Sequence, residues 1–521
     1  MNKKIILLII LLLGLILRIV FINTSPLSLY GDELTIALDV NSLVKTGHDQ
    51  LGNFLPLTFP MGAGRPGGYV YASMPFVALF GPTALGVRAL SILSGLGIII
   101  LLYLLCKKLF SEKVGIAAAI VTGVSAWDIS LSRGGFEAHF ALFLALLGVY
   151  LFLKAREKPI LYLFSAVSFG LTLHTYPTYK VALPLLLLLL VWFIGVKQIF
   201  AGLAKKYVLV AIVVLIILGL ASVSQTFVGG SEVRFFSINV FSQKDLAGKI
   251  EQKIDLERSI SHLPQSFVKY FHNKPVEYLK IVGENYLQNF STDFLFIHGD
   301  RNPRHNMATM GEFYLVEWIL ILIGLLSLWK DKKNMVFLIL WILLAPIPTA
   351  IIGDPHALRS ALMFPPMAIL SALGLLSLFG QKNKIAFLLV SLLFLIQFTF
   401  FLQKLYFLAP SEYAKFWAYS AKLASNNALE NKSKYQVIFL SDQIDGIEFG
   451  FPVYAGIDPR LVIDQNQQKT IVMGRNFKKF DNVYIGFLPE GSVDQFFKSL
   501  NKKALYISED QLTGQIITRS Q

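Results

Sequence analysis

Two adjacent carboxylates, Asp32 and Glu33, stand in the stretch YGDE, a few residues after a long apolar run has ended. A carboxylate can take a proton from a hydroxyl group and so act as a general base. Asp32 could equally be a helix N-cap for the stretch LTIALDV, because a capping carboxylate accepts hydrogen bonds from main-chain N–H groups. The residue pattern alone leaves both roles open.

Cations and histidines collect in the stretch HGDRNPRHN, residues 298–306. These nine residues hold two His, two Arg, one Asp and two Asn, directly before an apolar helix expected to begin near Phe313. A simple turn does not need that set, whereas an anion site does, because the planar guanidinium of arginine matches the oxygens of a phosphate. Arg301, Arg304 and His305 are therefore the first candidates for binding a phosphate group.

Further ionisable residues lie at the ends of other apolar runs, in the stretches SRGGFEAH, HTYPTYK and GDPHALR. The second candidates for phosphate binding are Lys180, Arg133 and Arg359. The candidates for binding the rest of a substrate are Glu137, His139, His174, Tyr176, Asp300 and His356. Simpler readings stay open, since Arg133 and Lys180 could extend towards lipid headgroups and the histidines could be held by neighbouring helices.

The composition indicates a membrane protein. Of the 521 residues, 55% are hydrophobic and 15% are charged, and the mean hydropathy is +0.59. Many apolar runs have the length of about 18–20 residues that a helix needs to cross a bilayer. We therefore predict an α-helical polytopic membrane protein with about eleven transmembrane helices. The expected spans are 5–22, 87–106, 114–130, 138–154, 160–176, 181–196, 207–224, 313–329, 335–352, 361–379 and 385–402.

The basic residues predict the orientation of these spans. Lys and Arg cluster in short loops, which marks the cytoplasmic side; the clusters lie at 106–113, 154–158, 197–206, 330–333 and 381–384. This places the N-terminus inside, the C-terminus outside and every candidate residue on the outer face. The net charge of +14 thus sets orientation and does not indicate a nucleic-acid partner.

Two sequence features limit the alternatives. The first apolar run ends in FINTSP and lacks the small residues of a cleavage site, so we expect an uncleaved first span. The single cysteine, Cys106, excludes an intramolecular disulfide and a zinc site built on several cysteines.

Two domains are expected. Residues 1–402 form a transmembrane domain with long outer loops at 23–86 and 225–312. Residues 403–521 have the composition of a soluble domain, and their β-type runs at 435–441, 470–474, 482–488 and 503–508, with a helix at 493–502, predict a small α/β domain outside the membrane. No G-x-x-x-x-G-K-[ST] phosphate loop occurs, so nucleotide hydrolysis has no support.

The candidates thus place one or two carboxylates opposite a group of cations at the outer surface of the membrane. A substrate whose leaving group is a lipid phosphate would carry its charge at this depth. The chain resembles the GT-C superfamily of membrane glycosyltransferases, in the branch of the protein O-mannosyltransferases and the lipid A aminoarabinose transferases. The features that carry the resemblance are YGDE (30–33), GVRALSILSG (86–95), SRGGFEAHFALFLAL (132–146) and HTYPTYKVALP (174–184).

This resemblance, over roughly residues 1–400, implies an inverting glycosyltransferase, either a hexosyl- or a pentosyltransferase. It implies Asp32 as the catalytic base with Glu33 beside it, a polyprenyl-phosphate sugar as the donor, and a hydroxyl-bearing acceptor on a protein, a glycolipid or a wall polymer. The implied location is the plasma membrane, with the active site and the C-terminal domain on the extracytoplasmic side. We expect no required cofactor and assign no metal ligand, although the outer histidines and acids are compatible with a divalent metal.

The chain departs from the family pattern in two places. The loop 225–312 is too short for the β-trefoil MIR domains of eukaryotic protein O-mannosyltransferases, and the tail 403–521 matches no known acceptor-binding module. The acceptor therefore stays open. The alternative functions are a polyprenyl-lipid transporter or flippase and a non-catalytic membrane scaffold.

Overall fold

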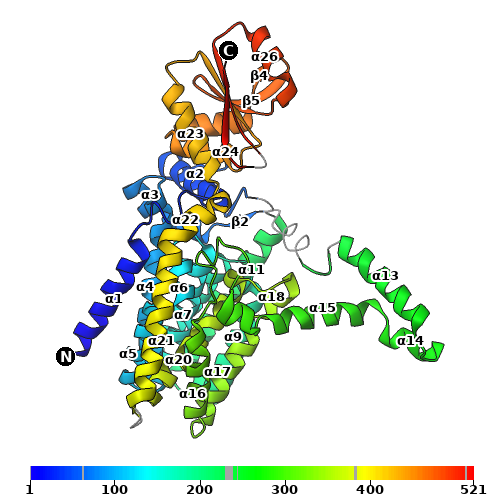
Figure 1. Ribbon diagram of the computed structural model, residues 1–521. Coiled ribbons are helices and arrows are strands. Elements are labelled where there is room, and N and C mark those ends of the chain that lie inside the picture. Colours follow the sequence, from blue (N-terminus) through cyan, green and yellow to red (C-terminus); the bar gives the residue numbers. More distant parts are fainter. Residues whose placement is uncertain are drawn as a thin grey trace.

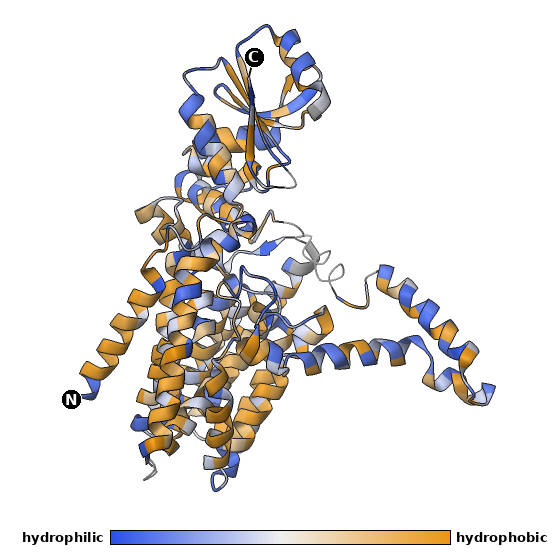
Figure 2. Ribbon diagram, in the orientation of Figure 1, coloured by the Kyte–Doolittle hydropathy of each residue, from blue (hydrophilic) through white to orange (hydrophobic). Residues whose placement is uncertain are grey.

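The computed structural model describes residues 2–61, 64–228, 239–242, 244–380, 384–510 and 513–520. Figure 1 shows a bundle of long helices, a helical arm that leaves the bundle sideways and a mixed α/β unit beyond one end of the bundle. The bundle helices are mostly hydrophobic, whereas the arm and the α/β unit mix hydrophobic and hydrophilic residues (Figure 2). This contrast is the one expected between membrane-embedded and water-exposed parts of a chain.

Each expected apolar run forms a helix, or two helices that follow each other closely. The helices of these runs are α1 (Lys3–Ile19), α4 (Ala84–Leu109), α5 (Glu112–Gly123) with α6 (Ala126–Ser132), α7 (Glu137–Lys154), α8 (Leu161–Leu173), α9 (Tyr179–Ile194), α11 (Ala204–Val228), α16 (Leu315–Ser327), α17 (Lys332–Leu344) with α18 (Ile347–Ile352), α20 (Phe364–Gly380) and α21 (Lys384–Gln403). Several runs are therefore confirmed as long helices.

Helix length and composition alone identify fewer membrane spans than the sequence predicts. Among the described residues, six helical segments are long and apolar enough to cross a membrane, or seven if α5 and α6, which meet at 58°, form one broken span. Helices α8, α9 and α16 are apolar but shorter. The total of about eleven spans stays a prediction, and residues 381–383 of one basic cluster and 229–238 and 243 of the second outer loop lie outside the described residues.

Helices α16 and α20 approach each other closely because two glycines face the partner's main chain. A Cβ atom on Gly324 would lie 1.9 Å from the carbonyl oxygen of Leu370, and one on Gly374 would lie 1.9 Å from that of Leu320. Small residues of this kind let membrane helices pack backbone to backbone.

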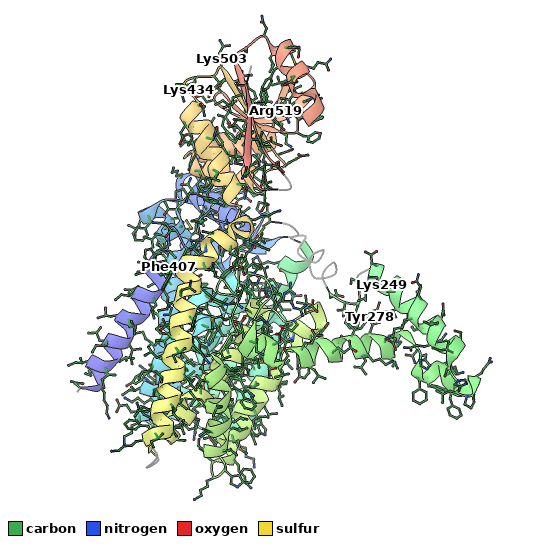
Figure 3. The ribbon with its side chains drawn as sticks, viewed as in Figure 1. Lys249, Tyr278, Phe407, Lys434, Lys503 and Arg519 are labelled. Carbon is green, nitrogen blue, oxygen red and sulfur yellow. The ribbon has the colours of Figure 1, made fainter. Side chains whose placement is uncertain are left out.

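Shorter elements connect the long helices or follow them. They are α2 (Gly31–Thr46), β1 (Thr58–Phe59), β2 (Arg65–Pro66), α3 (Gly68–Phe80), α10 (Val196–Ile199), α13 (Lys244–Ile260), α14 (Gln265–Phe271), α15 (Lys274–Gln288), η1 (Asp293–Ile297), α19 (Ala357–Ser360), η2 (Ala361–Met363), η3 (Lys404–Leu408), α22 (Ala409–Glu412) and η4 (Ala414–Trp417). Helices α13 to α15 form the arm, on which Lys249 and Tyr278 are labelled in Figure 3.

The C-terminal unit is a six-stranded mixed sheet in the order β4-β5-β6-β3-β7-β8. Its elements are α23 (Tyr419–Asn431), β3 (Val437–Ser441), α24 (Ile447–Tyr454), α25 (Pro459–Gln467), β4 (Thr470–Val472), β5 (Arg475–Phe480), β6 (Val483–Gly486), η5 (Glu490–Ser492), α26 (Val493–Leu500), β7 (Ala504–Glu509) and β8 (Ile516–Ser520). Strand β3 runs parallel to both neighbours, β6 and β7. Its five residues, VIFLS, are all buried, as a strand covered on both faces requires.

The four expected strands and the expected helix all occur in this unit, whereas β5 and β8 were not expected. The sequence of β5, RNFKKF, carries three cations, and β8 lies at the sheet edge with partly exposed residues. Neither has the apolar run that signals a strand.

The C-terminal unit and the segment before it hold the chain just ahead of α2. The Tyr454 hydroxyl lies 3.2 Å from the Leu29 amide nitrogen, from which it accepts a hydrogen bond, and the Lys422 ammonium donates to the Leu27 carbonyl at 2.8 Å. The Ser28 hydroxyl donates to the Trp417 carbonyl. These bonds fix where α2 begins and so position Asp32 and Glu33.

Candidate active site

Asp32 lies in the first turn of α2, one residue after the helix begins. The N-cap is Tyr30, so Asp32 is inside the helix and does not cap it. The Asp32 side chain is partly exposed, and its carboxylate has no hydrogen-bond or ion-pair partner among the residues that the structure describes. A carboxylate at this end of a helix is stabilised by the helix dipole while both of its oxygens stay available.

Arg65 holds the main chain of this turn in place. Its guanidinium donates to the Asp32 carbonyl oxygen at 3.1 Å and to the Thr35 hydroxyl at 3.0 Å, and its Nε lies 2.6 Å from a carboxylate oxygen of Glu137. Arg65 is buried. The start of α2 is thereby fixed to the start of α7, which brings Glu137 close to Asp32.

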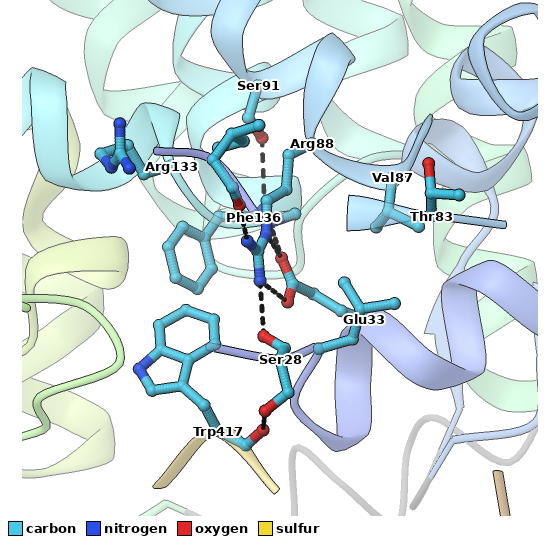
Figure 4. Close-up of polar contacts among 12 residues, drawn as sticks. Ser28, Glu33, Thr83, Val87, Arg88, Ser91, Arg133, Phe136 and Trp417 are labelled. Carbon is cyan, nitrogen blue, oxygen red and sulfur yellow. Dashed lines mark hydrogen bonds and ion pairs between the residues drawn. The ribbon is translucent and has the colours of Figure 1, made fainter. Parts of the chain in front are cut away.

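Glu33 lies in a buried ion pair with Arg88 (Figure 4). Arg88 of α4 donates to both of its carboxylate oxygens, at 2.7 and 2.8 Å, and the Gly135 amide donates to one of them at 2.8 Å. Both side chains of the pair have no exposed surface. The adjacent acids therefore do not share a proton, and Glu33 is bound on all sides.

Arg88 is in turn held by main-chain groups. Its remaining N–H groups donate to the carbonyls of Ile22 at 2.8 Å and Ser28 at 2.7 Å, and its guanidinium lies 5.4 Å from the ring centre of Trp417. The capping bond from the Gly86 amide to the Thr83 hydroxyl, at 3.2 Å, starts α4 one turn before Arg88. This arginine thus joins α4 to α2 and to the segment that follows α1.

Aromatic rings connect Asp32 to the stretch 298–306. The ring of Tyr30 packs 5.2 Å from Trp417 and 6.1 Å from Phe136, and the guanidinium of Arg304 lies over it at 5.4 Å. Burial raises the pKa of Tyr30 well above its ordinary value, and the charge of Asp32 raises it further. The phenol therefore stays neutral next to the Asp32 carboxylate.

Asp300, His305 and His356 form a compact cluster behind these rings. The His305 Nδ1 lies 3.0 Å and the His356 Nδ1 lies 3.7 Å from the same carboxylate oxygen of Asp300. Burial alone would raise the pKa of Asp300, but the hydrogen bond from His305 and the charges of His356 and His305 hold it at about 2. Each residue offers one ligand atom, and the three atoms lie within 4.8 Å of one another, so this set could hold a metal ion.

A buried acid, Glu312, binds the main chain of this cluster. The Glu312 carboxylate accepts a hydrogen bond from the Asp300 amide at 3.0 Å. Burial raises the pKa of Glu312 well above its ordinary value, and the neighbouring Asp300 charge raises it further. The shifts of the two carboxyl groups are therefore opposite in direction, and the Asp300 carboxyl ionises more readily than that of Glu312.

Arg133 and His139 lie in the interior, not beside Asp32. The Arg133 guanidinium is buried, donates to the carbonyls of Val20 at 2.8 Å and Ser25 at 2.5 Å, and lies 4.9 Å from the ring centre of Tyr406. The His139 Nε2 lies 2.8 Å from a carboxylate oxygen of Asp128. Asp128 also binds Arg18 of α1, and all three residues of that cluster are fully buried.

His174 and Lys180 bind helix α11. The two ring nitrogens of His174 lie 3.0 Å from Gln225 Oε1 and from the Leu218 carbonyl, and the Lys180 ammonium donates to the Ser222 carbonyl at 3.0 Å. Tyr176 is partly buried and packs against the hydrophobic core of the helix bundle. Of the remaining phosphate candidates, Arg301 is exposed, and Arg359 is partly buried and close enough for its charge to act on His356.

The structure thus brings two groups of the expected residues together. Glu137 joins Asp32 through Arg65. Arg304 lies over the Tyr30 ring, and His305, which meets Asp300 and His356, packs against Phe136. Sequence reasoning missed Arg88, Arg18 and Asp128 as members of buried ion pairs. The sequence did contain a signal for two of them, because Arg18 and Asp128 lie inside apolar runs. An unpaired charge in such a run is costly, so each of these residues is expected to form an ion pair.

Asp39, one to two turns further along α2, titrates near neutral pH. Its side chain is fully buried; one oxygen accepts a hydrogen bond from the Gln50 amide at 3.2 Å, and the other has no partner among the described residues. Burial raises the pKa of Asp39 from 3.8 to about 7. The folded protein therefore holds this proton more tightly than the unfolded chain does.

This shift predicts a pH-dependent stability. Because only the folded state binds the proton between pH 4 and 7, the free energy of unfolding falls as the pH rises from 4 to 8, by about 1.4 kcal/mol between pH 6 and 8. Asp39→Asn should make the stability less dependent on pH. The measurement is the melting temperature in detergent across that pH range. Asp445→Asn, at an exposed carboxylate before α24, is the matched control. Parallel pH profiles for wild type and Asp39→Asn would refute the assignment.

The comparisons with known proteins fit this geometry. Residues 65–221 match the family model of the dolichyl-phosphate-mannose-protein mannosyltransferases. No curated protein sequence matches the chain.

Solved structures share the fold of most of the chain. ArnT from Cupriavidus metallidurans in the apo state is 12% identical, with a TM-score of 0.54 over 97% of this chain and 93% of that one. The same ArnT bound to undecaprenyl phosphate gives 12% identity and a TM-score of 0.51 over 98% and 93%. The oligosaccharyltransferase of Archaeoglobus fulgidus in complex with Zn and sulfate is 15% identical, with a TM-score of 0.50 over 86% of this chain.

The chain spans 61% of the length of that oligosaccharyltransferase. At these identities the likeness concerns the fold. The expected resemblance to the GT-C superfamily is confirmed by the family match and by these neighbours.

Proposed function

We propose that this chain, which has the fold of the GT-C membrane glycosyltransferases, transfers a sugar from a polyprenyl-phosphate donor to an acceptor hydroxyl at the outer face of the plasma membrane. The observation that carries the proposal is the Asp32 carboxylate, which is partly exposed and without a partner among the described residues, while its neighbour Glu33 is fully bound. The match to a mannosyltransferase family and the ArnT structure with undecaprenyl phosphate support the class of donor.

In the proposed reaction, Asp32 takes the proton of the acceptor hydroxyl. The acceptor oxygen forms a bond to the anomeric carbon from the face opposite the lipid phosphate. The bond between the anomeric carbon and the phosphate oxygen breaks, and the electron pair leaves with the polyprenyl phosphate. The configuration of the sugar is therefore inverted.

The departing phosphate needs positive charge at its oxygens. Arg304 is the best-placed candidate, because its guanidinium lies over Tyr30, two residues before Asp32 in the chain. Arg301, exposed on the same stretch, is a second donor of charge. Arg133 and Lys180, which bind main-chain carbonyls, contribute in this proposal to the framework.

Arg304→Gln should raise the KM for the donor about tenfold, the effect of losing roughly 1.4 kcal/mol of binding, with a smaller change in kcat. The change removes a charge whose Nε also donates to the Phe416 carbonyl at 2.5 Å. The measurement is the initial rate against donor concentration in detergent. Lys415→Gln, at an exposed cation of the same segment, is the matched control. An unchanged donor KM in Arg304→Gln would remove Arg304 from the phosphate site.

The test of the function itself is sugar transfer in liposomes that contain the purified protein and a panel of polyprenyl-phosphate sugars, with acceptors added outside. The proposal expects a new glycosidic product with at least one donor. Movement of the donor between leaflets without any product would favour the transporter alternative and contradict the proposal.

A further inference from the structure

We propose that Asp300, His305 and His356 bind one divalent transition-metal ion, preferably Zn²⁺, which ties the loop 298–306 to the start of α19. The site goes beyond the sugar transfer proposed above, because that reaction is derived without a metal. Two histidines and one carboxylate are a donor set that Zn²⁺ commonly takes in proteins.

The distances are close to those of a metal site. Ligand atoms about 2.0–2.1 Å from a tetrahedral ion lie about 3.3 Å from one another. In the cluster, the Asp300 oxygen lies 3.0 Å from the His305 Nδ1 and 3.7 Å from the His356 Nδ1, which brackets that value. The two imidazole ring centres are 4.3 Å apart. Shifts of a few tenths of an ångström would complete the geometry.

One ligand atom has no other partner in the structure. The His356 Nδ1 is buried and accepts or donates no hydrogen bond within the described part of the chain. A buried polar atom without a partner is costly, by roughly 1–3 kcal/mol. A metal ion at this position would satisfy it.

The carboxylate is oriented by groups that are not ligands. The Asn302 amide donates to one oxygen of Asp300 at 2.8 Å, and the Ala357 amide donates to the other at 2.8 Å. Such outer contacts fix the ligands of metal sites and raise their affinity. They also link the two segments that the metal would join.

The charge of the cluster favours a cation over a phosphate at this spot. Asp300 lies between the two histidines and would repel a phosphate held by them. One charge disfavours a cation at this spot: Arg359, three residues after His356, is close enough for its positive charge to act on that histidine. The arginine assigned to the donor phosphate, Arg304, instead lies over the Tyr30 ring.

The metal would have a structural part in the active site. The His305 ring packs 5.6 Å from Phe136, and Phe136 packs 6.1 Å from Tyr30, so two ring contacts separate the cluster from the turn that carries Asp32. An ion here would hold the loop with Arg304 in place and would not touch the reacting atoms.

The test is metal content, measured without sugar transfer, so that its result is independent of the proposed function. The full-length protein in detergent is stripped with a chelator, dialysed against Zn²⁺ and analysed by mass spectrometry for zinc per chain. We expect one Zn²⁺ per wild-type chain, a visible absorption band when Co²⁺ is used instead, and a rise in melting temperature on adding Zn²⁺.

His356→Gln should weaken Zn²⁺ binding at least tenfold and abolish the Co²⁺ band. The matched control is His298→Gln, because His298 also pairs with an aspartate, Asp293, at 2.5 Å, but is exposed and lies outside the cluster. Asp300→Asn, which keeps the shape of the side chain, is the second variant if His356→Gln fails to fold. A stripped wild type that takes up no Zn²⁺, or variants of the cluster that bind Zn²⁺ like His298→Gln, would overturn the proposal.

Discussion

Replacing Asp32 with asparagine is expected to lower the rate of sugar transfer by about a thousandfold while the donor lipid still binds. Asparagine keeps the shape and the helix position of the side chain but cannot take a proton, and a general base typically contributes a factor of about 10²–10⁴. The Asp32 carboxylate has no partner among the described residues, and the bonds to its main-chain carbonyl do not involve the side chain, so the change should leave the fold intact. The measurement is the initial rate of transfer, with donor affinity determined separately.

Asp445→Asn, an exposed carboxylate in the C-terminal unit, is the control for this variant and should transfer sugar at the wild-type rate. Equal melting temperatures for wild type and Asp32→Asn would show that the loss is chemical. A rate for Asp32→Asn within tenfold of the wild type would mean that another group takes the proton.

The largest loss of stability is expected for Arg88→Met. The substitution leaves the Glu33 charge buried without its partner, and breaking a buried ion pair in this way costs about 3–5 kcal/mol. It also removes the hydrogen bonds to the Ile22 and Ser28 carbonyls, which hold the chain ahead of α2. The measurement is the melting temperature in detergent together with the yield of monodisperse protein.

The double variant Glu33→Gln/Arg88→Met separates the two causes. Glutamine can still accept the hydrogen bond from the Gly135 amide but carries no charge, so the double variant should recover part of the melting temperature lost in Arg88→Met. If Arg88→Met melts like the wild type, the ion pair contributes little and the start of α2 must be fixed by other contacts.

The sequence predicts the helices of the bundle well because their signal is local. An apolar run of sufficient length marks a membrane helix whatever its neighbours are, and the runs at 87–106 and 138–154 became α4 and α7. The strands of the C-terminal unit were predicted where they are apolar, as in β3, and missed where they are polar, as in β5.

The contacts among the candidate residues could not be predicted from the sequence, because partners distant in sequence cannot be read from a local pattern. Asp32 and Glu33 look alike in sequence, yet Arg88 binds Glu33 from 55 positions away, whereas the Asp32 carboxylate has no such partner in the part of the chain that the structure describes. Arg133 was expected to bind a phosphate or to extend towards lipid headgroups, but its partners are main-chain carbonyls of Val20 and Ser25, which no residue pattern signals.

The contacts of the histidines also depend on partners that are distant in sequence. His305 and His356 stand about fifty residues apart in sequence and meet at Asp300 in the structure. His139, in contrast, is tied to Asp128 in the interior. All of these histidines were expected at the outer ends of apolar runs, and that common position did not distinguish which of them would meet.

The most direct test of Asp32 as the base of a single displacement is the anomeric configuration of the product. A donor of defined configuration is supplied to wild-type protein in liposomes, and the linkage in the isolated product is determined by nuclear magnetic resonance. The account predicts complete inversion, since the acceptor oxygen attacks opposite the leaving phosphate. A product with retained configuration would contradict it, because retention requires a second displacement that a base at Asp32 does not provide.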